Sequence, residues 1–256
     1  MHDEAVRFHT SKGMTFYVRG KGRPIVFLHG WCLNRKMWVY AEEALMSEFQ
    51  VVTPDLPGFG QSDHLAGPYT LDRYGNEVET LLEEAKLNDA ILVGFAFGAA
   101  VAIQCATAFP ANVKGVVAVA IPGASHSPYS RMPKAMRRDW PDFARKSANA
   151  LFHTPQSEAT LHWLEALFAA APLPVALETV QVLSSYEPVE VVGRVEAPVL
   201  FLHADHDGVA PESLGLACAQ ATPKGRLEVV RDCGHLIVLD QKIAFHEQLK
   251  SFLQTI

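Results

Sequence analysis

The amino-acid sequence predicts an α/β fold: a mostly parallel sheet with helices on both faces and a helical insertion between its two halves. Short, wholly apolar runs alternate with helical patterns along the chain, as expected of strands that are covered on both faces. This alternation stops over residues 125–192 and then resumes. The stretch 90–109 passes from an apolar run, through a turn bracketed by glycines, directly into a helix of small residues.

The first half of the chain alternates strands and helices. Two short strands at its start are joined by a turn at residues 11–13, and Pro110 ends the last helix of this half. We expect strands at 6–9, 14–18, 25–28, 50–53, 90–93 and 116–121, and helices at 39–46, 69–85 and 98–109.

The second half repeats the pattern, with strands expected at 199–203 and 226–230 and helices at 211–221 and 243–253. We therefore assign residues 1–124 and 193–256 to one core domain. The segment 125–192 between them is rich in alanine, aromatic residues and proline. We expect it to form a helical lid over the carboxyl ends of the strands, where open α/β sheets bind ligands. A plain structural excursion is the alternative.

Composition limits the classes of function. The 256 residues can bury a sizeable core, and 49% are hydrophobic and 20% charged. The net charge of −6 argues against a general nucleic-acid-binding surface. The start of the chain shows no signal-peptide pattern, and no apolar run approaches ~20 residues, so we expect a cytoplasmic protein without a membrane span.

The four cysteines form no Cys-x-x-Cys pair. They are Cys32, Cys105, Cys218 and Cys233. This spacing implies neither a zinc site nor a disulfide framework, so we expect buried free thiols and no metal or organic cofactor.

The turn at Gly94-Phe95-Ala96-Phe97-Gly98 matches a nucleophile elbow, Gly-x-Ser-x-Gly, except that Ala96 occupies the serine position. In such a turn the central side chain stands clear of the sheet, and the glycines avoid crowding the neighbouring strand and helix. The following helix directs its positive N-terminal end towards any anion formed there. Alone, the pattern also fits an ordinary turn between a strand and a helix.

Three further motifs follow predicted strands: His29-Gly30-Trp31, the stretch Asp55–Ser62, and a pair of acid and histidine loops near the C-terminus. Together with the elbow, in this order, they resemble the α/β-hydrolase superfamily over nearly the full chain. Gly30-Trp31-x-Leu33-Asn34, Trp38 and residues 55–60 resemble carboxylesterases of the kind that removes the methyl ester from pimeloyl-acyl carrier protein. The resemblance implies an α/β-hydrolase fold.

The resemblance implies Asp207 as the acid and His235 as the base of a catalytic triad. Asp207 lies three residues after Ala204 and four before Pro211, as the family's acid does. Asp205 is the alternative acid, and we expect it to cap or brace the loop instead. His235 follows the last predicted strand, where a histidine can take a proton from the nucleophile and pass it to the leaving group.

The resemblance also implies an oxyanion hole made by the backbone N–H groups of Trp31 and Phe97. Alanine at position 96 leaves these donors in place. We expect the substrate to be bound by the side chains of Trp31, Phe95, Phe143 and Trp163.

Ala96 is the departure from the family, because a methyl group cannot attack a carbonyl carbon. One interpretation is an engineered Ser-to-Ala substitution in an otherwise intact site. The other is a natural, non-catalytic receptor that binds a ligand. Hydrolysis by water activated by His235 is a third, minor interpretation.

The resulting hypothesis is a carboxylic ester hydrolase that forms an acyl-enzyme through a Ser-His-Asp triad, inactive as given because of Ala96. A lactonase, thioesterase, perhydrolase or carbon–carbon bond hydrolase would use the same framework. A dehalogenase or epoxide hydrolase would need aspartate at position 96.

A basic cluster opens the predicted lid in a chain that is acidic overall. It consists of Arg131, Lys134, Arg137, Arg138, Arg145 and Lys146. An acidic acyl carrier protein that delivers the ester could dock on it through long-range attraction. A solvated helix face is the alternative.

Overall fold

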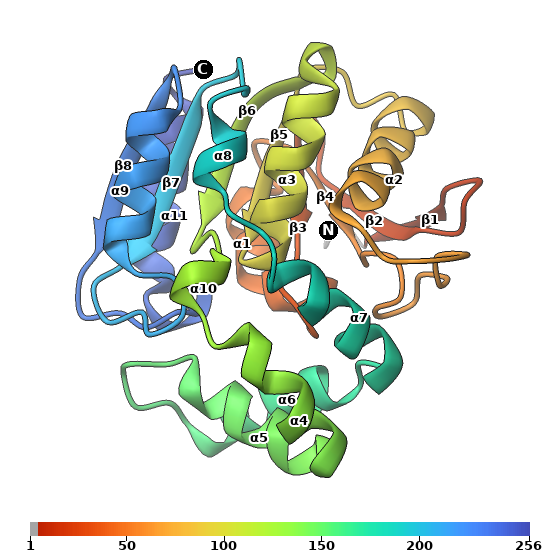
Figure 1. Ribbon diagram of the computed structural model, residues 1–256. Helices are drawn as coiled ribbons and strands as arrows, with labels where there is room; N and C mark the ends of the chain where they lie inside the picture. Colours follow the sequence, from red (N-terminus) through yellow and green to blue (C-terminus); the bar gives the residue numbers. More distant parts are fainter. Residues whose placement is uncertain (1–4) are drawn as a thin grey trace.

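The computed structural model describes residues 5–256, which form an eight-stranded sheet in the order β1-β2-β4-β3-β5-β6-β7-β8 (Figure 1). β2 pairs antiparallel with β1 and β4, and every other pairing is parallel, as the sequence predicts. The strands are β1 (Val6–His9), β2 (Thr15–Arg19), β3 (Pro24–Leu28), β4 (Gln50–Pro54), β5 (Ala90–Phe95), β6 (Val113–Val119), β7 (Val199–Ala204) and β8 (Gly225–Val230).

The middle of the sheet is buried on both faces. Every residue of β3, β5 and β7 is buried, whereas every residue of the edge strand β1 is exposed. Strands that are covered on both sides carry continuous apolar runs, so these strands could be predicted from the sequence. The parallel order aligns the ends of β3, β5 and β7 at one edge of the sheet.

Helices cover both faces, with α2, α3 and α9 in front of the sheet and α1 and α11 behind it in Figure 1. α3 is buried around most of its circumference, as its small and apolar residues require. The core helices are η1 (Arg35–Trp38), α1 (Val39–Leu45), α2 (Leu71–Glu84), α3 (Phe97–Ala108), η2 (Pro110–Asn112), α8 (Val189–Val192), α9 (Glu212–Ala221), α10 (Ile237–Asp240) and α11 (Lys242–Leu253).

Residues 125–192, called the helical insertion from here on, connect β6 to β7 and lie mostly beyond one end of the sheet, at the bottom in Figure 1. Within it α8 makes its main helix contacts with α3 and α9 of the core. The group that lies beyond the sheet therefore ends before α8. Its helices, with the short turn that leads into it, are η3 (Ala124–His126), η4 (Tyr129–Arg131), α4 (Met132–Arg138), α5 (Trp140–Ala150), α6 (Glu158–Ala169) and α7 (Leu173–Leu183).

Some element boundaries differ from the prediction. The strand expected at 116–121 spans Val113–Val119, because Val113 already pairs with Ala90 and the backbone turns at Ala120, whose φ is 49°. The short helix α10 was not predicted. All four cysteines are buried and unpaired, as expected.

Among residues 5–256, no single helix is both long and apolar enough to span a membrane; α6 and α7 meet that criterion only as a pair bent by 90°.

Candidate active site

Ala96 sits at the sharp turn between β5 and α3. Its φ is 46° and its ψ is −108°, a conformation that non-glycine residues seldom adopt. The surrounding backbone fixes the turn: the N–H of Ala96 donates to Val119 O at 2.8 Å, and its carbonyl accepts from Ala99 N at 2.9 Å. The sheet and the helix thus hold residue 96 in the geometry of a nucleophile elbow.

The two glycines of the elbow allow three backbone segments to meet. A Cβ on Gly94 would lie 2.2 Å from Gly98 O, and a Cβ on Gly98 would lie 2.1 Å from Leu28 O. Both contacts are with backbone atoms that cannot move aside, so only hydrogen fits at either position.

Asp207 and His235 meet at the ends of neighbouring strands. Asp207 follows β7, His235 follows β8, and His235 Nδ1 lies 2.7 Å from Asp207 Oδ2. The other carboxylate oxygen of Asp207 accepts from the backbone N–H groups of Val209 at 2.7 Å and Ala210 at 2.9 Å. Because Nδ1 faces the carboxylate, Nε2 is the ring nitrogen left to exchange a proton.

The environment of Asp207 favours its charged form. Burial by itself raises the pKa of this carboxyl, but the charge of His235, its hydrogen bond and the two backbone N–H donors outweigh it. The net effect lowers the pKa of Asp207 below its ordinary value. The side chain is 0% exposed and that of His235 is 6% exposed, so solvent screens the pair little.

Asp205, the alternative acid, bonds to the loop after β8. Its oxygens accept from the backbone N–H groups of Asp232 at 3.1 Å and Cys233 at 3.2 Å. It therefore ties the loop after β7 to the loop after β8, and in the described chain it makes no hydrogen bond to His235.

Among residues 5–256, two backbone N–H groups near residue 96 donate to no protein acceptor. Phe97 begins α3, so its N–H has no acceptor within the helix. Among residues 5–256, the N–H of Trp31 likewise donates to no protein acceptor. His29 supports the turn that carries Trp31: its Nδ1 lies 2.9 Å from Gly30 O and its Nε2 accepts from Leu56 N at 2.8 Å.

A cavity of about 250 Å³ adjoins Ala96, and its walls are mostly apolar. Three of the four predicted substrate-binding side chains line it: Trp31, Phe95 and Phe143. The core contributes to one side of it and the helical insertion to the other. Its lining also includes Leu33, Phe97, Pro128, Tyr129, Met132, Ser147, Ala150, Leu151, Phe168, Leu183, Val209 and His235.

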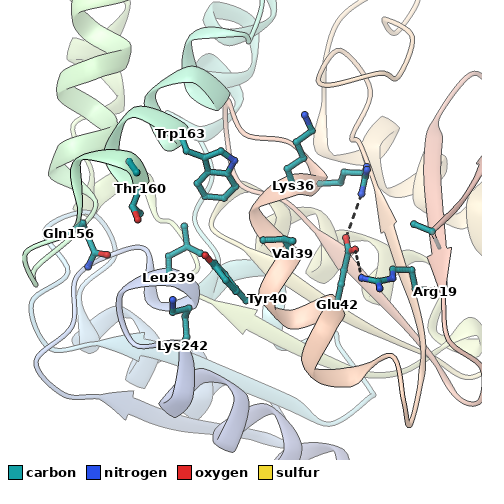
Figure 2. A pocket seen from close by; sticks show the side chains of 13 residues that line it. Arg19, Lys36, Val39, Tyr40, Glu42, Gln156, Thr160, Trp163, Leu239 and Lys242 are labelled. Carbon is teal, nitrogen blue, oxygen red and sulfur yellow. Dashed lines mark ion pairs between the residues drawn. The ribbon is translucent and has the colours of Figure 1, made fainter. Parts of the chain in front are cut away.

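Trp163, the fourth predicted substrate-binding residue, does not line the cavity at Ala96. It lines a separate cavity of about 610 Å³, where Figure 2 shows it facing Val39 and Leu239. Phe168 of the same helix lines the cavity at Ala96 instead. Five residues separate the two, about 140° around a helix, so they face different sides.

A hydrogen bond that the sequence does not predict joins the turn that carries Trp31 to the helical insertion. The indole Nε1 of Trp31 donates to the hydroxyl of Thr179, on α7, at 2.9 Å. Its ring also meets those of Phe143 and Phe168 edge-on. Trp31 and Thr179 are 148 positions apart, and no local pattern links them.

The basic cluster lies exposed on and beside α4 and α5, where Arg145 and Lys146 both pair with Asp142. Between these helices is a cavity of about 310 Å³ flanked by Arg138 and Lys146. Three residues line both this cavity and the one at Ala96: Phe143, Ser147 and Ala150.

Known proteins share this sequence pattern and architecture. The chain is 26% identical to AB hydrolase superfamily protein YisY of Bacillus subtilis, over 95% of this chain and 97% of that protein. It is also 26% identical to the pimeloyl-[acyl-carrier protein] methyl ester esterase of Vibrio atlanticus, over 95% and 99% of the two chains.

Among solved structures, an esterase from Exiguobacterium antarcticum superposes with a TM-score of 0.90 at 21% identity, covering 98% of this chain and 100% of that one. The enol-lactonase from Burkholderia xenovorans LB400 superposes with a TM-score of 0.88 at 18% identity, covering 97% and 100%. At these identities the superpositions show a shared fold.

The family described as "Alpha/beta hydrolase family" matches residues 25–247, which include the elbow, Asp207 and His235. The chain therefore belongs to the alpha/beta hydrolase family.

Proposed function

We propose that this chain, with serine at position 96, is a carboxylic ester hydrolase, and that Ala96 makes the present form inactive. One observation carries the proposal: the Asp207–His235 pair, joined at 2.7 Å, opens onto the same cavity as residue 96 at the elbow. The esterase names of several relatives, such as that from Vibrio atlanticus, support the same reaction class.

In the proposed mechanism the hydroxyl of a serine at position 96 attacks the ester carbonyl and passes its proton to His235 Nε2. Asp207 holds the imidazole through Nδ1 and stabilises its charged form. The N–H groups of Trp31 and Phe97 donate to the oxyanion. His235 then protonates the leaving alcohol. Water, activated by the same histidine, attacks the acyl-enzyme and releases the acid.

We infer that Ala96 is an engineered substitution. The supporting observation is that the rest of the site is complete: the strained turn, both close-packed glycines and the buried acid–histidine pair are present. A protein that only binds a ligand has no need of them. A natural receptor of this fold is the second candidate, and alanine itself is the observation that favours it.

We propose that the helical insertion acts as a lid over the site and that the ester arrives on an acyl carrier protein. The relatives named as esterases of pimeloyl-[acyl-carrier protein] support this substrate class. The cavity between α4 and α5 supports it too, because it joins the basic cluster to the walls of the cavity at Ala96. The four buried thiols are consistent with a cytoplasmic location.

The test is the Ala96→Ser variant, assayed against p-nitrophenyl esters of increasing chain length, a lactone and a thioester. We expect p-nitrophenyl ester hydrolysis to exceed that of the Ala96 form by about a thousandfold or more. Ala96→Ser/His235→Ala is the control and should lose this gain. Faster turnover of the lactone or thioester would reassign the reaction class, and no gain on any substrate would favour the receptor.

A further inference from the structure

We infer that Asp240 is a positioning residue that couples the catalytic histidine to the helical insertion. Asp240 ends α10, five residues after His235, and does not line the cavity at Ala96. The inference rests on the proposed function only in taking His235 as the base.

The carboxylate of Asp240 accepts hydrogen bonds from two segments of the chain, the loop that carries His235 and the loop between α5 and α6. Oδ2 accepts from the N–H of Gly234 at 2.7 Å and from the N–H of His153 at 2.8 Å. Oδ1 accepts from Thr154 N and Gln156 Nε2, both at 3.2 Å, and from the hydroxyl of Thr154. One side chain thus joins the residue before His235 to the loop between α5 and α6.

The residue after His235 is held by the same loop. Leu236 N donates to Leu151 O at 2.9 Å. Gly234 is packed so closely that a Cβ there would lie 2.6 Å from His153 N and 2.8 Å from Leu151 O. The helical insertion therefore constrains the backbone on both sides of His235. A shift of this loop must move the imidazole or break these bonds.

A carboxylate suits this junction because every partner is a donor. An asparagine at position 240 keeps the shape but places an NH₂ group against N–H donors. If the amide turns its oxygen towards Thr154, the N–H groups of Gly234 and His153 lose their acceptor; if it turns its oxygen towards Gly234, the N–H of Thr154 loses its acceptor. Either orientation weakens the link between the loop that carries His235 and the helical insertion. The predicted result is a shifted His235, without removal of any group that touches substrate.

The first measurement uses the Ala96 protein and needs no activity. The Nδ1 proton of His235, hydrogen-bonded to Asp207, is followed by one-dimensional proton NMR in the unsubstituted chain and in Asp240→Asn. We expect the downfield resonance to move upfield or to broaden beyond detection. An unchanged resonance in a folded Asp240→Asn variant overturns the inference.

The second measurement places the same substitution in the Ala96→Ser chain. We expect kcat for a p-nitrophenyl ester to fall by about 100-fold, as for a misplacement of about 1 Å, while KM changes little. Asp139→Asn is the matched control: Asp139 caps α5 within the insertion and, in the described part of the chain, makes no bond to the loop that carries His235. Its kcat should be unchanged.

Two milder variants test the coupling from the insertion side and cover the case in which Asp240→Asn does not fold. Thr154→Val and Gln156→Ala each remove side-chain donors to Asp240 but leave its bond to Gly234. We expect each to lower kcat and shift the Nδ1 resonance in the same direction, by less than Asp240→Asn. If both leave kcat and the resonance unchanged, the coupling is overturned.

These experiments distinguish a failure of the proposed function from a failure of the positioning role of Asp240. If Ala96→Ser is inactive on every ester while the resonance responds to Asp240→Asn, the proposed function fails and the positioning role stands. If Ala96→Ser is active and neither kcat nor the resonance responds to Asp240→Asn, only the positioning role fails.

Discussion

At residue 96 the backbone holds φ at 46° although the side chain is a methyl group. A non-glycine residue in such a conformation costs free energy of order 1–3 kcal/mol, and the fold supplies it through the sheet and the helix that meet there. Strain of this kind is common where a side chain must be presented for chemistry. The strained geometry at residue 96 therefore supports the proposal that this is the nucleophile position, whatever side chain occupies it.

A substitution at Gly98 tests how closely the elbow is packed. We expect Gly98→Ala to lower the free energy of unfolding by more than about 2 kcal/mol, because the new Cβ would lie 2.1 Å from Leu28 O. Urea denaturation measures the change. Gly208→Ala is the control, since its Cβ would meet nothing within 4 Å, and should stay within about 0.5 kcal/mol. Equal stability of the two variants would contradict the packing account.

The lowered pKa of Asp207 predicts how the stability of the protein depends on pH. Its pKa is lowered in the folded protein, so its charge adds stability above the unfolded value near 3.9. That contribution is lost as pH falls through the lower folded pKa. We expect the stability advantage of the unsubstituted chain over Asp207→Asn to shrink between about pH 5 and about pH 3. Denaturation at both pH values measures it, and an advantage that grows towards acid would contradict the assignment.

Residues that stand in a local motif could be predicted from the sequence. Asp207 and His235 could be singled out because each follows a strand in a short, patterned loop. Thr179 and Asp240 could not, because their roles arise from contacts with distant segments: Thr179 with Trp31, and Asp240 with residues 153–156. No local spacing encodes such contacts.

Among the elements, α7 supports the site through one hydroxyl. Thr179 accepts from Trp31 Nε1 while donating to Val175 O at 2.7 Å within its own helix. Trp31 is the residue that would supply one of the two oxyanion donors. The helical insertion therefore contacts the proposed catalytic machinery at the turn that carries Trp31 as well as at the loop that carries His235.

This support predicts the effect of Thr179→Val. The substitution leaves the indole N–H without its acceptor, so we expect the free energy of unfolding to fall by about 1–3 kcal/mol. Thr107→Val is the control, because Thr107 donates to Ile103 O at 2.8 Å in the same helical manner and has no further hydrogen-bond partner among residues 5–256. It should cost less than about 1 kcal/mol. Denaturation compares the two, and equal losses would contradict a role for the indole bond.

Strands were easier to predict than the orientation of inserted helices. β3, β5 and β7 carry continuous apolar runs because both of their faces are covered. α6 carries apolar residues on most sides, from Leu161 to Phe168, so its sequence does not reveal which side faces the cavity. The sequence of α6 therefore could not show that Trp163 and Phe168 line different cavities.

Across the whole molecule, charge is unevenly distributed. The chain carries a net charge of −6, yet six exposed cations gather on and beside α4 and α5. Separated charges of this kind raise the rate of encounter with an oppositely charged partner and are screened by salt. The proposed acidic carrier is such a partner.

Charge reversal within the basic cluster tests whether an acidic carrier protein docks there. In the Ala96→Ser chain, we expect Arg137→Glu/Arg138→Glu to lower kcat/KM for a carrier-linked ester by about tenfold or more at low salt, and to leave a free p-nitrophenyl ester unaffected. Lys114→Glu/Arg194→Glu is the control, because these exposed cations lie outside the cluster, on β6 and after α8. A similar loss in both pairs would show a general charge effect and exclude specific docking.

The most direct test of the account is covalent labelling of the Ala96→Ser chain with a fluorophosphonate, followed by intact-mass and peptide analysis. The serine hydroxyl attacks phosphorus and fluoride leaves, so the labelling does not depend on the identity of the natural ester. We predict one adduct, on the peptide that contains residue 96, absent from the Ala96 form and at least about a thousandfold slower to form in Ala96→Ser/His235→Ala. No adduct, or an adduct on another serine in both forms, would contradict residue 96 as the nucleophile position.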